Sequence, residues 1–496
     1  MKEKELFDLV KEIELLKSAN NLLEWDMQTG MPEESSGFRG EQVGVISELI
    51  FDRINGEKMA ELLEYFEAHP EEVSDLGKKL LRFLKVSIGR VKAIPKAEYL
   101  AYQKETTSAF QNWLEARMAK DFQVFLPSLE RLIAMKKSFI PLWRQDEATP
   151  YDVLLNQFEP GMTTESLDKV FHDLKVGIKE IQHVLQTKGT APDASFIHRP
   201  IPIEIQKKFS KQVATELGFD FNRGRLDESV HPFMEGLNSK DTRLTARWAE
   251  DDFLMGVFGV LHEQGHGQYE QNVSPAFDYT PLGNSMSMGL HESQSLFQEI
   301  MIGSNRAFWK RQFPIFNQMT SGVFKDIDEF DFFKGIKQTS SSLIRIEADT
   351  LTYCLHIIIR YEIEKAIFNE DYPVAELPKL WAELYEEYLG ISPKNDLEGI
   401  LQDVHWTSDF GYFPSYALGY MYAAQMKHAM NRDLDFEKAL ETGDYPRIKR
   451  WLDTHVRQYG VTKTPTEILQ SSTGEKLNPD YLLDELKNLY YDVYQV

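Results

Sequence analysis

The sequence predicts a mainly α-helical protein with one small β-sheet, and three observations carry this prediction. Apolar residues recur every three or four positions through most of the 496 residues. Only the segment 219–248 changes to an alternating pattern rich in β-branched and aromatic residues. A content of 42% hydrophobic residues is enough to bury a large core. Because no linker, repeat or low-complexity segment interrupts the pattern, we expect a single large helical body over residues 1–496.

The amino-terminal part is expected to be helical, with few interruptions. Residues 25–32 end in Met-Pro and are expected to form a loop. Thr163 has the chemistry of a helix cap, and residues 187–203 form the clearest loop. The helices expected here span residues 3–24, 38–68, 71–94, 97–140 (one helix or two), 164–186 and 204–217.

The sheet should lie directly before a strongly apolar run at 253–261. Its three short strands are expected around 225–226, 231–234 and 242–248. Residues 334–369 have the pattern of one long helix, on which Arg345, Asp349, Thr352 and His356 would share a face. The other helices expected after the sheet span 286–303, 307–332, 375–389, 417–430, 436–442, 445–458, 464–471 and 478–494.

Charge and cysteine content exclude several classes of protein. The formal net charge is −23, which repels nucleic-acid phosphate and argues against DNA or RNA binding. The single cysteine, Cys354, sits in an apolar helical run, so we expect a buried thiol and no thiolate metal site. The first residues start an amphipathic helix rather than a signal peptide, and no run of about 18 apolar residues occurs. We therefore expect a cytoplasmic protein without a membrane span.

The stretch 261–266, Leu-His-Glu-Gln-Gly-His, carries the clearest chemical signal. His262 and His266 are one helical turn apart, so both imidazoles could reach one zinc ion at about 2.0–2.1 Å. This is the His-Glu-x-x-His arrangement of zinc peptidases. The apolar run before it indicates a helix buried in a core that turns its polar face to a cleft. Two core histidines bonded to backbone carbonyls are the alternative, which a second polar helix at a suitable distance makes less attractive.

Glu263 lies about 100° further round the helix than His262, so it would reach a metal-bound water rather than the metal. The metal lowers the pKa of such a water towards about 7. Glu263 could then take its proton as the water attacks a peptide carbonyl and pass it to the leaving amine.

Zinc needs a third protein ligand and an open fourth position. The best candidate is Glu292, 26 residues after His266, because this distance leaves room for a loop and a returning helix. The competing candidates are Glu270, His291 and Glu299.

Two further regions offer groups for binding and stabilising a substrate. His405, beside Asp403, and the tyrosines of the aromatic run 410–416 could donate to an oxyanion, although aromatic packing explains each tyrosine equally well. Arg345, one helical turn from a carboxylate, could grip the C-terminal carboxylate of a peptide. Spacing alone favours an ordinary surface pair of arginine and aspartate.

The chain as a whole resembles the carboxypeptidase Taq family of metallocarboxypeptidases. The resemblance runs from Trp25 to the Gly-Tyr-Phe-Pro region, and the zinc motif shows no departure from the family pattern. The matching pieces, in order, are Trp25-Asp26, Met31-Pro32, Tyr151-Asp152, Glu159-Pro160-Gly161-Met162, His231-Pro232-Phe233, Asp241-Thr242-Arg243-Leu244-Thr245, the stretch 262–266, His291-Glu292-Ser293-Gln294, Ile344-Arg345, Ala348-Asp349, Gln402-Asp403, His405-Trp406 and the stretch 410–416.

This resemblance implies a neurolysin-like gluzincin fold with a deep groove, a homodimer, and one Zn2+ per chain, with Co2+ possible. It implies release of single C-terminal residues with broad specificity from peptides that have a free carboxylate. In terms of the family, His262, His266 and Glu292 are the ligands, Glu263 is the base and Arg345 holds the substrate carboxylate. We further predict His405 and Tyr416 as catalytic groups, and His231 and Tyr412 as substrate-binding groups beside Arg345.

Two rival functions remain open at this point. A neurolysin-type metallo-endo-oligopeptidase shares the groove and the metal site but needs no anchor for a terminal carboxylate. A non-enzymatic helical binding protein would need no stoichiometric metal.

Overall fold

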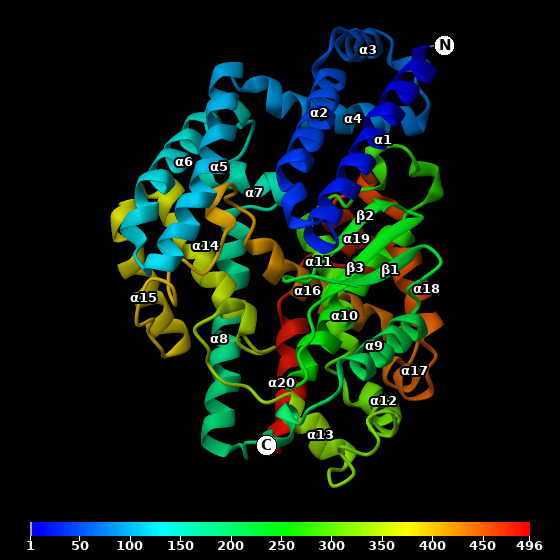
Figure 1. Ribbon diagram of the computed structural model, residues 1–496, viewed down its shortest axis with the longest axis vertical. Helices are drawn as coiled ribbons and strands as arrows, with labels where there is room; N and C mark the ends of the chain where they lie inside the picture. Colours follow the sequence, from blue (N-terminus) through cyan, green and yellow to red (C-terminus); the bar gives the residue numbers. More distant parts are fainter. Residues whose placement is uncertain (1) are drawn as a thin grey trace.

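The structure, a computed structural model, describes residues 2–496, and most of them are helical (Figure 1). The helices expected before the sheet are present, with 38–68 and 97–140 each divided into two. The elements of this part are α1 (Lys2–Thr29), α2 (Ser36–Asn55), α3 (Glu57–Ala68), α4 (Asp75–Ala93), α5 (Lys96–Ala119), α6 (Phe122–Trp143), α7 (Pro150–Phe158), α8 (Thr164–Lys188) and α9 (Ile203–Leu217).

The sheet has three strands, as predicted, in the order β1-β3-β2. β1 (Gly224–Glu228) runs parallel to β3 (Asp241–Ala246), and β2 (Met234–Asn238) runs antiparallel to it. His231 lies just before β2 rather than in it. A small apolar cluster that includes Phe219, Leu244 and Val260 packs this sheet against α9 and α10 (Phe253–Gln271).

The carboxyl-terminal part returns to helices and encloses α10. Most expected helices are confirmed, with ends shifted by a few residues. They are α11 (Met288–Leu296), which continues as one π-helical segment, η6 (Phe297–Ile302), then α12 (Arg306–Met319), α13 (Glu329–Ile336), α14 (Tyr353–Asn369), α15 (Leu377–Leu389), α16 (Pro414–Met430), α17 (Phe436–Thr442), α18 (Tyr445–His455), α19 (Pro465–Thr473) and α20 (Asp480–Tyr494).

The loop predicted at residues 25–32 is wrong for most of its length, because α1 continues to Thr29. Trp25 is buried, and the guanidinium carbons of Arg225 and Arg243 lie 5.0 and 4.7 Å from its ring centroid. These contacts with two strands stabilise the last turns of α1. The local sequence gives no sign of them, since the partners lie about 200 residues further along the chain.

The single helix predicted at 334–369 is also wrong. α13 ends at Ile336 and α14 begins at Tyr353, with an irregular segment at 337–352 that contains one short 3-10 turn. The polar run 339–342 favours this break, because Thr and Ser side chains compete with the helical backbone for hydrogen bonds. Asp349 accepts hydrogen bonds from the backbone N–H groups of Leu351 and Thr352 at 2.8 and 3.1 Å. The four polar residues predicted to share a helix face therefore do not.

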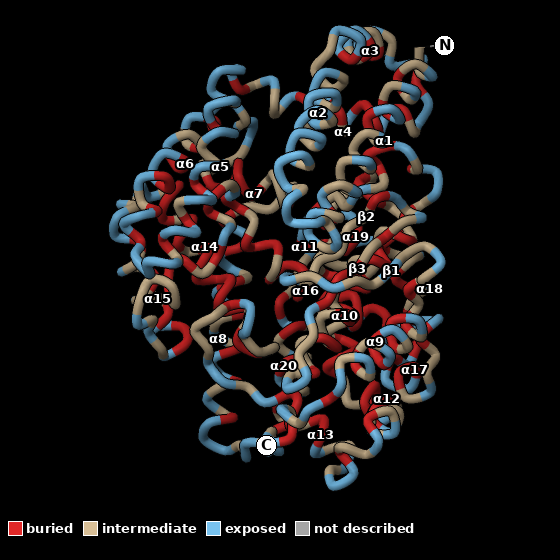
Figure 2. Tube along the Cα trace, viewed as in Figure 1, coloured by how far each residue is buried: buried red, intermediate tan, exposed pale blue. Residues whose placement is uncertain are grey.

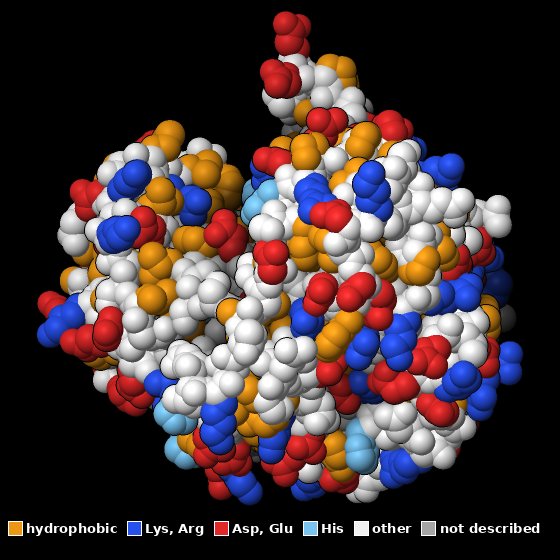
Figure 3. Space-filling view, turned by 90° about the horizontal axis from the view of Figure 1, so that it is seen from below, with side chains coloured by type: hydrophobic (Ala, Val, Ile, Leu, Met, Phe, Trp, Pro, Cys, Tyr) orange, Lys and Arg blue, Asp and Glu red, His pale blue; other side chains and the backbone are white. Residues whose placement is uncertain are grey.

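One cluster of buried apolar side chains extends from α1 to α20. Burial is greatest in α10, α11, α14 and α16, whereas α2 has no buried residue (Figure 2). The surface is hollowed between two lobes when seen from below (Figure 3). A cleft of about 620 Å³ is lined by residues of α10, α11, α16 and the irregular segment before α14. No helix within residues 2–496 combines the length and apolarity needed to cross a bilayer.

Candidate metal centre and active site

His262, His266 and Glu292 come together on the wall of this cleft, and we call them the metal cluster. Nε2 of His262 lies 3.7 Å from one carboxylate oxygen of Glu292, and Nε2 of His266 lies 3.5 Å from the other. Ligand atoms around a tetrahedral ion with bonds of about 2.0–2.1 Å are about 3.4 Å apart. The spacing and the donor chemistry, two imidazoles and one carboxylate, therefore fit a divalent ion such as zinc.

Glycines let the helices that carry the metal cluster approach one another. A Cβ atom on Gly265 would lie 2.6 Å from the Cα of Ser295 in α11. A Cβ atom on Gly419 of α16 would lie 2.8 Å from the Cβ of Glu292. Both distances are shorter than Cβ atoms tolerate, so α10 and α16 pack closely against α11 only because these positions lack side chains. This close packing places Glu292 opposite the two histidines.

The three competing ligand candidates lie outside the metal cluster and hold its imidazoles in place. Nδ1 of His262 pairs with the Glu299 carboxylate at 2.8 Å. Glu299 belongs to the π-helical segment η6, and such segments often re-aim side chains at functional sites. His291 stacks on His266 with a centroid distance of 4.5 Å, and Glu270 pairs with His291 at 3.1 Å. A carboxylate in the position of Glu299 fixes the orientation of a ligating imidazole, whereas His266 is held by stacking on His291.

Glu263 lies on the cleft wall next to the metal cluster and is mostly buried. Within residues 2–496 no hydrogen bond reaches its carboxylate. Burial raises the pKa of Glu263 to about 7, with the Glu292 and Glu299 carboxylates adding to the rise and His262 opposing it. An unpaired carboxylate beside a metal site is placed to accept a proton from water.

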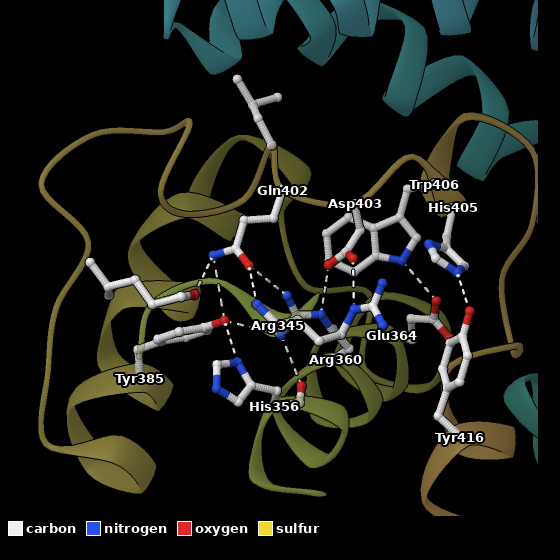
Figure 4. A network of polar contacts seen from close by, with 12 residues as sticks. Arg345, His356, Arg360, Glu364, Tyr385, Gln402, Asp403, His405, Trp406 and Tyr416 are labelled. Atoms are coloured by element: carbon white, nitrogen blue, oxygen red, sulfur yellow. Dashed lines mark hydrogen bonds and ion pairs between the residues drawn. The ribbon is translucent and has the colours of Figure 1, made fainter. Parts of the chain in front are cut away.

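Arg345 lines the same cleft, but its carboxylate partner is not the predicted Asp349. Nε of Arg345 donates to Oδ1 of Asp403 at 2.8 Å, and Nε of Arg360 donates to Oδ2 at 2.7 Å (Figure 4). Gln402 accepts from the Arg345 backbone N–H at 3.1 Å. Tyr385 in turn receives a hydrogen bond from Arg360 at 3.1 Å. We call these five residues the arginine network.

Tyr412 and Tyr416 both line the cleft, as their predicted roles require, with ring centroids 5.2 Å apart. His405 does not belong to the cleft lining and lies behind Tyr416, its Nε2 3.1 Å from the phenol oxygen (Figure 4). Burial lowers the pKa of His405 to about 4, so the imidazole is neutral at pH 7. His231 is exposed beside Pro232, which is itself part of the lining.

Arg360, the fully buried arginine of the network, is not among the residues predicted from the sequence. It follows three isoleucines in α14, and its guanidinium lies 4.4 Å from the Trp381 ring centroid. An arginine inside such an apolar run is a usable signal, because arginine is almost never fully buried without a partner. The partner itself, Asp403, could not be identified from spacing.

The cleft holds the site of a His-Glu-x-x-His metallopeptidase. It has two histidines one turn apart, a glutamate from the following helix and a free glutamate beside them. Comparison with known proteins gives the family. The family model described as carboxypeptidase Taq (M32) metallopeptidase matches residues 5–490. The chain belongs to this family and is a metallocarboxypeptidase.

Individual relatives match over nearly their whole length. Carboxypeptidase 1 of Bacillus subtilis (strain 168) is 46% identical over 99% of this chain and 98% of its own. Thermostable carboxypeptidase 1 of Thermus thermophilus is 34% identical, again over 99% of this chain and 98% of its own. The crystal structure of the M32 carboxypeptidase from Deinococcus radiodurans R1 has a TM-score of 0.94 at 31% identity and covers 100% of both chains.

Proposed function

We propose that this metallocarboxypeptidase releases single amino acids from the C-terminus of peptides by attack of a water molecule that Glu263 deprotonates. The observation that carries the proposal is the position of Arg345, which lines the same cleft as the metal cluster and Glu263. Its guanidinium would bind the C-terminal carboxylate, which limits cleavage to the last peptide bond. We propose that the whole chain, 1–496, acts as one catalytic unit.

His262, His266 and Glu292 would hold the metal, for which we propose Zn2+, with Co2+ as a possible substitute. A bound ion of this kind supplies a Lewis acid that makes water acidic enough to lose a proton near neutral pH. Glu263 accepts that proton on its carboxylate and later donates it to the leaving amine.

Tyr416 is the proposed donor to the oxyanion that forms on the scissile carbonyl. Tyr416 lines the cleft, and its phenol oxygen is 3.1 Å from Nε2 of the neutral His405. If that Nε2 carries the imidazole proton, it donates to the phenol oxygen and leaves the phenol proton directed to substrate. His405 would then act as a positioning residue through Tyr416.

Broad side-chain specificity is supported by the apolar part of the cleft wall, which includes Phe233, Met234 and Met288. Methionine side chains adapt to ligands of different shape. We propose that Tyr412 contacts the substrate directly and that His231, at the rim, meets its upstream part. We also propose a homodimer, which light scattering coupled to gel filtration would test.

The decisive experiment compares one peptide with a free C-terminal carboxylate and the same peptide amidated at its C-terminus. Mass spectrometry should show a ladder of products shortened one residue at a time from the free acid, and no cleavage of the amide. A chelator should abolish the ladder, and metal analysis should find one ion per chain. Internal cleavage of both peptides at equal rates would instead support the neurolysin-type endopeptidase.

A further inference from the structure

Arg360 is fully buried in α14, and the proposed mechanism gives it no task. Each of its three guanidinium nitrogens donates at least one hydrogen bond. Nε donates to Asp403, and Nη1 donates to the His356 carbonyl at 2.9 Å and to Tyr385 at 3.1 Å. Nη2 donates to Gln402 at 3.1 Å. The residue is thus fixed in one position directly behind Arg345 (Figure 4).

Asp403 is shared between two arginines, one on each carboxylate oxygen. Oδ1 accepts from Arg345 at 2.8 Å, and Oδ2 accepts from Arg360 at 2.7 Å. Both bonds use Nε atoms, so neither arginine forms the two-bond pair that the fork-shaped guanidinium prefers with a carboxylate. Two positive groups and one negative group leave this buried site with a net positive charge.

Two aspartates elsewhere in the chain, each with a single arginine partner, form the two-bond pair. Arg243 donates from Nε and Nη2 to the two oxygens of Asp241, both at 2.9 Å. Arg225 does the same with Asp227, both at 2.6 Å. In these two pairs the aspartate binds Nη2 as well as Nε of its single arginine, a geometry open to Asp403 if it had only Arg345 as a partner.

Arg345 differs from these two arginines because its two Nη atoms are not held by the aspartate. Its Nη1 makes only a long contact of 3.4 Å with the hydroxyl of Tyr353. No hydrogen bond from the described residues, 2–496, reaches its Nη2. Because Arg360 occupies the second oxygen of Asp403, the outer edge of the Arg345 guanidinium is left for another anion.

We infer that Arg360 is a positioning residue that, by sharing Asp403 with Arg345, keeps the site net positive and leaves the Arg345 guanidinium open for the substrate carboxylate. The inference rests on the proposed role of Arg345 as the carboxylate anchor. Without Arg360, Asp403 would close onto Arg345 with both oxygens, neutralise it and remove Nη2 from the cleft.

Variants at position 360 test this through KM. With zinc-loaded protein and an N-blocked peptide with a free carboxylate, Arg360→Gln should raise KM about tenfold, as expected for a lost charge-assisted bond. kcat should change less than KM does. Arg360→Lys loses the fork and the Trp381 contact, but it keeps a positive charge for the second oxygen of Asp403, so its KM should rise less than that of Arg360→Gln and stay within about threefold of wild type. Arg360→Met is a second neutral variant should glutamine prevent folding, which thermal unfolding will report.

A double variant separates positioning from simple support of the fold. In Arg360→Gln/Asp403→Asn no carboxylate remains to neutralise Arg345, so KM should return to within about threefold of wild type. A merely structural role predicts that the double variant is no better than Arg360→Gln. Equal KM values for the Gln and Lys variants, or a double variant without recovery, would overturn the inference.

Two further comparisons of KM distinguish failure of this inference from failure of the proposed function. Arg345→Ala should raise KM at least as much as Arg360→Gln does. If Arg345→Ala leaves KM unchanged, the anchor itself is wrong and the inference is lost with it. If only the Arg360 variants leave KM unchanged, the anchor stands and the inference alone is wrong. Arg457→Lys, at another fully buried arginine paired with an aspartate at 3.0 Å, should lower stability without the KM pattern.

Discussion

The metal cluster and Arg345 of the arginine network line one cleft, yet the cluster and the network are built in different ways. The metal cluster lies on two regular helices, α10 and α11, that approach closely at Gly265. The arginine network joins an irregular segment, two helices (α14 and α15) and a loop through buried hydrogen bonds and the ion pairs to Asp403. Backbone packing therefore positions the metal ligands, whereas charge positions the substrate anchor. Substitutions in the two regions should therefore change different measured properties of the protein. Each of these properties tests the comparison.

The largest effect is expected from Glu263→Gln, next to the metal cluster. Glutamine cannot accept a proton from water, so kcat should fall by about 10²- to 10⁴-fold. The metal content should stay near that of wild type, because Glu263 is not one of the three residues of the cluster. Steady-state kinetics and metal analysis on the same sample measure both. A kcat within about threefold of wild type would remove Glu263 from the mechanism.

Tyr416→Phe probes the residue that lies between the two regions. Loss of an oxyanion donor costs about 10²- to 10³-fold in kcat, and KM should change little. Tyr412→Phe is the matched control, since its ring lies 5.2 Å away on the same cleft. It should affect KM more than kcat. If Tyr412→Phe shows the larger loss of kcat, the two roles must be exchanged.

The same difference in construction explains what could be predicted from the sequence. Local periodicity predicts which segments are helical and where most helices begin and end. The spacing of His262 and His266 on one helix is local as well. Their meeting with Glu292 was predicted, since only one loop separates the two helices. The pairing of Arg345 with Asp403 spans 58 residues and depends on how two irregular segments meet, so spacing favoured the wrong partner, Asp349. The helix predicted through Arg345 failed for the same reason, because long-range hydrogen bonds hold the irregular segment.

Gly265→Ala should act on the metal cluster through packing alone. The added Cβ would lie 2.6 Å from the Ser295 Cα, which forces α10 and α11 apart. Overpacking of this kind costs about 1–3 kcal/mol of unfolding free energy and should weaken metal binding. Urea unfolding and a metal-competition titration measure the two effects.

Gly259→Ala, in the same helix, is the matched control. Within the described chain, no atom outside the adjoining residues and backbone of its own helix lies within 4 Å of the Cβ it would add. It should stabilise the protein by about 0.5–1 kcal/mol, because alanine favours a helix over glycine. If both alanines destabilise equally, the close approach at Gly265 does not position the metal cluster.

An effect that is absent near neutral pH, a change of slope at acid pH, separates charge from packing most directly. Burial alone would raise the pKa of Asp403, but the Arg345 and Arg360 guanidiniums outweigh burial and hold it well below its usual range. An unfolded aspartate has a pKa of about 3.9, so the stability from this pairing is fully present above about pH 5 and is lost as pH falls towards the folded pKa. The difference in unfolding free energy between metal-free wild type and Asp403→Asn should be constant from about pH 5.5 to 8 and shrink by about 1.4 kcal/mol per pH unit below about pH 4. The corresponding difference for Gly265→Ala should not follow this slope, because the substitution removes no titratable group. A constant difference for Asp403→Asn down to about pH 3 would mean that charge does not hold the arginine network together.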